Sequence, residues 1–106
     1  MSAMLTTITP YWGRPDMLRK WAKALESAHV PGQTVHILFC VGESLPDCAR
    51  VPYIHSYFCQ EAPGLSIGHY HNLGAELANT PWIMKLDLDA LPHAGFFRAH
   101  ALLQHA

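Results

Sequence analysis

Two aspartates, Asp87 and Asp89, end the most hydrophobic segment of the chain, WIMKLDLDAL at 82–91. In an extended chain, residues two apart point the same way, so both carboxylates can be presented on one side. Hard oxygen ligands at this spacing suit Mg²⁺ or Mn²⁺, and such an ion bridges phosphate oxygens. The pair therefore predicts a divalent-metal site for a diphosphate. The structural alternative is that Asp89 caps a turn before Pro92.

Histidine and cysteine offer a second, weaker kind of metal site. The chain has eight histidines, and only His69 and His71 are close neighbours. A spacing of two on a helix directs these two rings to different faces. Three cysteines, Cys40, Cys48 and Cys59, include no CxxC pair, which favours reduced thiols over a disulfide framework. A zinc or redox site built on these residues lacks proper ligand spacing.

The composition limits the class of protein. A chain of 106 residues suits one domain, and half of its residues are apolar. Only 14% are charged and the net charge is −1, which argues against a nucleic-acid partner. The start, MSAMLTTITPYWG, has neither a basic beginning nor a long apolar run. We therefore expect a cytoplasmic protein without a signal peptide or membrane span.

Strand-like and helix-like patterns alternate along the sequence. Strands are expected at 4–10, 34–41, 51–58 and 82–87, the last of them inside the sheet because it is apolar, and helices at 14–29, after a cap at Ser66, and at 93–106. The first helix should bury an apolar face made of Met17, Leu18, Trp21, Ala22 and Leu25. The second helix should bury a face made of Ile67, Tyr70, Leu73, Gly74 and Leu77. This order predicts a three-layer α/β/α domain with a mainly parallel sheet. Ligands of such sheets bind beyond the carboxyl ends of the strands, where PYWGR, VGES and DLDA fall.

Two segments carry a resemblance to a known family. LTTITPYWGRPDMLRKWAKAL at 5–25 resembles the first strand and helix of family 2 glycosyltransferases, which have the GT-A fold. HNLGAELANTPWIMKLDLDAL at 71–91 resembles their middle motif, in which an Arg-Asn-x-Gly helix leads into a strand ending in DxD. The two segments keep the order and roughly the spacing of the family. The resemblance implies that residues 1–106 form a Rossmann-like half-domain that binds a nucleotide-diphosphate sugar.

The resemblance also implies roles for individual residues. Pro10, Tyr11 and Trp12 would lie beside the base and ribose, where an aromatic ring can stack on a nucleobase. Asn72 and Gly74 match the helix that shapes the floor of the site. Trp12 could instead be a hydrophobic plug, and Gly74 is better explained by close packing of helix on sheet.

The metal site has a role in the same scheme. Asp87 would contact the ribose or the metal, and Asp89 would hold Mn²⁺ or Mg²⁺ at the diphosphate. The donor that the resemblance favours is a UDP-sugar.

Several positions depart from the family pattern. Where members carry an acidic pair after the second strand, this chain has Cys40 and Val41 in CVGES. Glu43 is nearby and could take over a ribose or base contact. Gly13 replaces the usual Asn, and His71 stands where the family often has Arg.

The segment after the DxD motif is short. Residues 90–106 follow it, whereas the acceptor site and the base of inverting members lie well beyond the motif. We therefore expect a donor-binding half, truncated relative to the family, with no visible catalytic base; His93 is the nearest titratable group after the motif. The resulting hypothesis is a glycosyltransferase acting on an acceptor that the sequence does not identify. The alternative is a non-catalytic GT-A-derived binding or assembly module, whose apolar surface would attract a second copy or a partner subunit.

Overall fold

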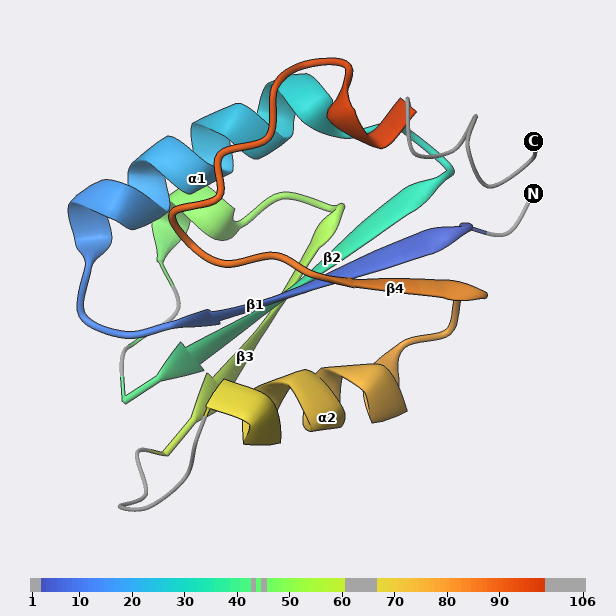
Figure 1. The fold of residues 1–106 in the computed structure, drawn as a ribbon. Helices are drawn as coiled ribbons and strands as arrows, with labels where there is room; N and C mark the ends of the chain where they lie inside the picture. Colours follow the sequence, from blue (N-terminus) through green and yellow to red (C-terminus); the bar gives the residue numbers. More distant parts are fainter. Residues whose placement is uncertain (1–2, 43, 45, 61–66, 99–106) are drawn as a thin grey trace.

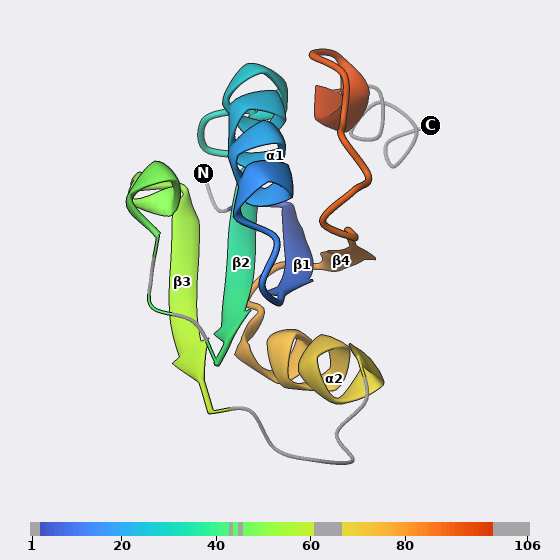
Figure 2. The ribbon, with the colours of Figure 1, turned by 90° about the vertical axis from the view of Figure 1, so that its left-hand side faces the viewer.

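The computed structural model describes residues 3–42, 44, 46–60 and 67–98. Four parallel strands form one sheet in the order β3-β2-β1-β4, with bounds β1 Leu5–Tyr11, β2 Thr34–Val41, β3 Ile54–Cys59 and β4 Trp82–Lys85. Helix α1 (Pro15–Ala28) covers one face and α2 (Ile67–Leu77) the other, as Figures 1 and 2 show. The predicted three-layer α/β fold is confirmed and is consistent with a Rossmann-like half-domain.

The central strands explain why a proline is tolerated in the sheet. β2 occupies the predicted residues, because a continuous run of apolar and β-branched side chains suits a strand covered on both faces. β1 includes Pro10. The carbonyls of Met4 and Ile8 accept bonds from the amides of Trp82 and Leu86, so alternate residues of β1 face β4. Pro10 continues this series past the end of β4, where its missing N–H costs no ladder bond.

Helix α1 follows its sequence signals. Pro15 occupies the first turn, and the helix ends at Ala28, before Pro31 and Gly32. Gly32 has φ +76°, a left-handed conformation that glycine adopts without strain. The predicted apolar face packs on the sheet, with these residues buried: Leu18, Trp21, Ala22 and Leu25.

Helix α2 buries the middle of the expected face but not its ends. Tyr70 and Gly74 are buried as predicted, and Leu73 is half-buried against the core, but Ile67 and Leu77 are exposed. His71, beside this face, is buried as well. The expected face was therefore too long and did not include His71. Ser66, the expected cap, lies outside the described residues.

Gly74 sets the line along which α2 contacts the sheet. A Cβ atom on Gly74 would lie 2.6 Å from Cγ2 of Ile8 on β1. The helix therefore rests on β1 along the line through Gly74, and its flanking residues Tyr70 and His71 turn inward. Close packing is the structural role of this glycine.

β4 differs from the expectation most. We expected an interior strand at 82–87, but β4 spans Trp82–Lys85 and lies at the edge of the sheet, paired with β1. Trp82 is 48% exposed and Ile83 45%. An apolar run in the sequence does not reveal where its strand stands in the strand order. The residues just beyond the strand, Leu86 and Leu88, are the buried ones.

The third strand and the last helix also differ from their expected bounds. β3 starts and ends later than the expected 51–58, and a short 3-10 helix, η1 (Asp47–Ala49), lies in the loop before it. The expected last helix does not begin at residue 93: residues 93–95 are not helical, and a helical turn begins at Phe96, whose neighbour Phe97 is buried. Residues 99–106 of that expected helix lie outside the described residues. None of the described helices has the length and apolar character needed to cross a bilayer.

Candidate functional site

A cavity of about 250 Å³ lies at the carboxyl edge of the sheet. It joins the segment after β1, the start of α2 and the turn after β4. Its lining residues are Pro10, Trp12, Arg14, Ile67, Asp87, Leu88 and Asp89. The fold therefore brings the two motif segments of the sequence into one site.

Backbone contacts to β1 fix the start of the aspartate turn. The amide of Leu86 donates to the carbonyl of Ile8 at 3.0 Å, and Oγ1 of Thr9 donates to the carbonyl of Leu86 at 2.7 Å. The amide of Ala90 then donates to the carbonyl of Asp87 at 3.0 Å. The chain thus leaves the strand and closes a turn at the two carboxylates, rather than staying extended through both as expected.

Alternating burial still presents both carboxylates on one side. Leu86 and Leu88 are buried in the apolar cluster beneath α1, whereas Asp87 and Asp89 are exposed. Within the described part of the chain, neither carboxylate forms a hydrogen bond or ion pair. Both are therefore available to a cation, and the turn is closed by backbone atoms without an aspartate side chain as its cap.

The aromatic residues after β1 separate into two environments. Trp12 is half-buried, lines the cavity and meets Tyr70 edge-on, with ring centroids 5.3 Å apart. Tyr11 is buried in the cluster beneath α1 and does not line the cavity. Gly13 has φ +42°, a region that Gly and Asn enter most readily, so its replacement of the family's Asn has a backbone reason. Trp12 therefore packs against Tyr70 as a hydrophobic plug and also lines the cavity.

Arg14 is a cavity residue that the sequence reasoning did not assign. It precedes Pro15 at the start of α1 and lines the same cavity as the two aspartates. A guanidinium group matches phosphate oxygens in a bidentate manner. The segment PYWGR, which contains Arg14, was expected at this edge of the sheet, but no role was assigned to its arginine.

His71 was also not assigned, and it lies within electrostatic reach of the aspartates. Its Nε2 is buried and has no hydrogen-bond partner among the described residues. Burial lowers the pKa of His71, the charge of Lys85 lowers it further, and Asp87 opposes the shift. The ring is therefore neutral at neutral pH, where the family's Arg would carry a fixed charge.

Other predicted residues lie away from the cavity or outside the described chain. Asn72 is exposed on α2 and does not line the cavity. Glu43 lies outside the described residues. Cys40 and Val41, which stand at the family's acidic positions, are buried. Of the residues expected near the ribose, Pro10, Trp12 and Asp87 line the cavity.

The donor set suits a hard divalent ion in one respect. Asp87 and Asp89 offer oxygen ligands on an accessible wall, and Mg²⁺ commonly takes one or two carboxylates together with substrate phosphates. Among the described residues, no three His, Cys, Asp or Glu side chains gather around one point. The remaining ligands of an ion here would have to come from a phosphate group and water.

Comparison with known proteins adds no relative to this picture. No protein-family model matches the chain, and no curated protein matches it.

Proposed function

We propose that this chain binds a nucleotide-diphosphate sugar through Mn²⁺ or Mg²⁺ at Asp87 and Asp89, as the donor-binding half of a glycosyltransferase. One observation carries the proposal. The DxD turn and the residues after β1, Pro10 and Trp12, line a common cavity at the carboxyl edge of a parallel sheet, where ligands of such sheets bind.

The lining residues fit distinct parts of this donor. The half-buried ring of Trp12 offers a stacking surface for a nucleobase, with a UDP-sugar as the first candidate. Arg14 offers a cation for the diphosphate. A bound divalent ion supplies charge neutralisation to the diphosphate as it leaves the sugar.

The size of the cavity limits what it can enclose. Its volume of about 250 Å³ falls just below the roughly 300–1,000 Å³ typical of small-molecule sites. The metal and diphosphate would fill it, with the base resting on Trp12 and the sugar extending past the sheet edge. Transfer with inversion also requires a base for the acceptor hydroxyl, and no described residue is assigned that role.

The alternative is a non-catalytic binding or assembly module on the same scaffold. The exposed apolar side chains at both edges of the sheet favour it: Tyr57 and Phe58 on β3, and Trp82 and Ile83 on β4. Open sheet edges with apolar side chains attract partners or second copies.

Thermal unfolding with UDP, GDP, CDP and ADP, each with and without Mn²⁺, tests the proposal. A ligand at 100 times its dissociation constant adds about 2.7 kcal/mol to the free energy of unfolding. We expect a manganese-dependent rise in Tm for one nucleotide, absent in Asp89→Ala and retained in Asp47→Ala, an exposed aspartate on η1. If no nucleotide raises the Tm, the donor-site proposal fails and the assembly module is favoured.

A further inference from the structure

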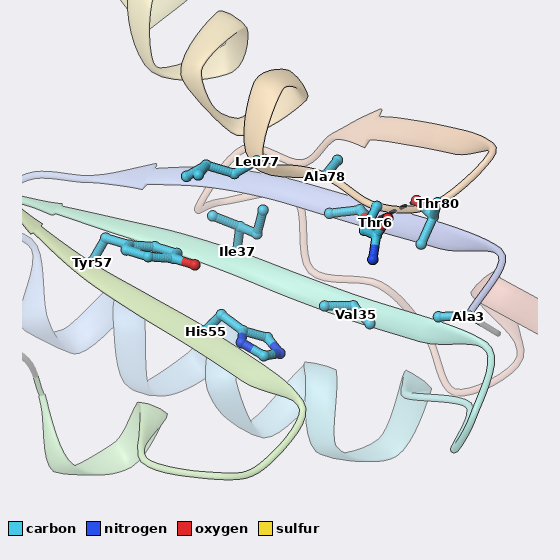
Figure 3. Close-up of a pocket in the computed structure, with 10 residues that line it drawn as sticks. Ala3, Thr6, Val35, Ile37, His55, Tyr57, Leu77, Ala78 and Thr80 are labelled. Carbon is cyan, nitrogen blue, oxygen red and sulfur yellow. Dashed lines mark hydrogen bonds between the residues drawn. The ribbon is translucent and has the colours of Figure 1, made fainter.

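A second hollow lies on the α2 side of the sheet, near the opposite ends of the strands from the DxD turn. Its volume is about 550 Å³, inside the roughly 300–1,000 Å³ typical of small-molecule sites. Val35 and Ile37 of β2 form its floor, and His55 and Tyr57 of β3 form one wall. Leu77 at the end of α2 stands on the other border (Figure 3).

Two flat rings project into this hollow from β3. His55 and Tyr57 are two residues apart in a strand, so both point to the same face of the sheet. The ring of Tyr57 leans on Phe39, with centroids 5.8 Å apart, and remains 39% exposed. Phe58, between Tyr57 and the end of the strand, points to the other face. The wall therefore offers ring surface to a ligand from a position held by the sheet.

Two threonine hydroxyls at the border of the hollow form hydrogen bonds whose donors can be assigned. Oγ1 of Thr80 donates its proton to the carbonyl of Trp82 at 2.8 Å. The 2.7 Å contact between the hydroxyls of Thr80 and Thr6 must therefore be donated by Thr6. Both protons are used, so these two oxygens can only accept further bonds. A ligand that meets them must bring donors.

The remaining polar groups can donate as well as accept hydrogen bonds. The amide of Asn79, the phenol of Tyr57 and the imidazole of His55 all line the hollow. Among the described residues that line the hollow there is no Asp, Glu, Lys or Arg. A phosphate, carboxylate or amine would therefore find no carboxylate, ammonium or guanidinium group of opposite charge among them, and the hollow suits an uncharged ligand.

We propose that this hollow binds a neutral saccharide. A sugar brings a hydroxyl donor for Oγ1 of Thr80, which is half-buried whereas Thr6 is buried, and mixed donors and acceptors for Asn79 and Tyr57. Its face of C–H bonds suits the electron-rich faces of the His55 and Tyr57 rings. The hollow lies away from the metal cavity, so the proposal holds or fails independently of nucleotide binding.

Titration of the ¹⁵N-labelled chain with cellobiose, maltose and lactose tests it, with amide chemical shifts as the readout. At least one disaccharide should give saturable shifts centred on His55, Tyr57 and residues 77–80. Phenyl phosphate, which is charged, should give none there. UDP with Mn²⁺ added to the same sample reports separately on the cavity at Asp87 and Asp89.

Variants connect those shifts to the lining groups. Asn79→Ala and Tyr57→Ala should each weaken disaccharide binding about tenfold, and Tyr57→Phe, which keeps the ring, should weaken it less. Phe58→Ala is the matched control, because Phe58 is 60% exposed on the same strand but faces away from the hollow. Dispersed spectra establish that each variant is folded.

Three results would overturn the proposal. One is the absence of saturable shifts with all three disaccharides. Another is a response to indole, a neutral aromatic probe, without any response to sugar. The third is equal weakening by Phe58→Ala and Tyr57→Ala, which would place the effect outside the hollow.

Discussion

At the scale of single residues, Gly74 and Ile8 show how one absent methyl group sets the height of α2 above the sheet. A Cβ on Gly74 would lie 2.6 Å from Cγ2 and 2.8 Å from Cδ1 of Ile8, both closer than real Cβ atoms approach. Ile8 is fully buried and cannot move aside without disturbing its neighbours. The glycine is therefore required by packing, which agrees with its interpretation from the sequence.

Gly74→Ala should lower the free energy of unfolding by about 1–2 kcal/mol. Overpacking costs about 1–3 kcal/mol, and the better helix propensity of Ala returns up to about 1 kcal/mol. Urea unfolding of Gly74→Ala, Ile8→Ala and the double variant measures the coupling. Ile8→Ala removes the contacted atoms, so the double variant should lose less than the sum of the single losses. Strict additivity would contradict the proposed contact.

His36 is a buried histidine whose ionisation the fold opposes. Its Nδ1 lies 2.6 Å from Oγ1 of Thr7, and its Nε2 has no hydrogen-bond partner within the described chain. Burial lowers the pKa of His36 to about 3, with smaller contributions from His29 and His55. The ring is therefore neutral in the folded protein, while in the unfolded chain it takes up a proton near pH 6.5.

Acid should therefore destabilise the fold through His36. The unfolded state binds the extra proton, so stability is fully present above pH 6.5 and falls as the pH drops towards 3. The loss should approach about 1.4 kcal/mol per pH unit. Urea midpoints measured from pH 7 to 4 check this, with His36→Gln as the control. The lowered pKa values of His29 and His71 add to the slope in both proteins. Equal slopes would show that His36 is not the titrating group.

At the scale of elements, local patterns predicted which segments are helices and strands better than where each one lies. β2 matched its predicted bounds because a central strand buries both faces, and its sequence shows this directly. β4 was expected inside the sheet, although its position depends on which strands pair with it. The buried face of α2 was predicted correctly in its middle but not at its ends, because Ile67 and Leu77 lie beyond the part of the helix that Gly74 holds against β1.

The two faces of β4 should differ sharply in stability. Ile83 is exposed on the α2 side, whereas Met84 packs against the core beneath α1. Ile83→Ala should change the free energy of unfolding by about 0.5 kcal/mol or less. Met84→Ala should cost about 1–2 kcal/mol, less than a fully buried methionine, because Met84 is only partly buried. Thermal unfolding compares them, and a larger loss for Ile83→Ala would place β4 inside a sheet.

At the scale of the whole molecule, the site could be predicted in part. Topology alone placed Pro10, Trp12 and the DxD turn at one edge, because parallel strands share their carboxyl ends. Tyr11 was expected beside them, but strand alternation directs it to the opposite face from its neighbours. Arg14 lines the site at the start of α1, and His71 on α2 lies within electrostatic reach of Asp87; both positions depend on tertiary packing. Whether these residues bind a nucleotide stays a prediction.

The segment after β4 connects the DxD turn with the apolar cluster beneath α1. It starts at the DxD turn and then runs along the α1 side of the sheet, as Figure 2 shows. Phe97 anchors it there: its side chain is 1% exposed, and its ring lies 5.3 Å from that of His36. Leu86 and Leu88 belong to the same buried cluster. Packing beneath α1 therefore helps to hold the aspartates at the carboxyl edge of the sheet.

Phe97→Ala should consequently cost about 3–4 kcal/mol, near the middle of the range for a buried phenylalanine. Phe96→Ala is the matched control, since Phe96 is only partly buried beside it and should cost less than half as much. Urea unfolding measures both losses. Amide hydrogen exchange should also accelerate at 86–90 in Phe97→Ala but not in Phe96→Ala, because only Phe97 anchors the segment that carries the turn. Unchanged exchange at 86–90 would mean that β1 alone, through Ile8 and Thr9, holds the DxD turn in place.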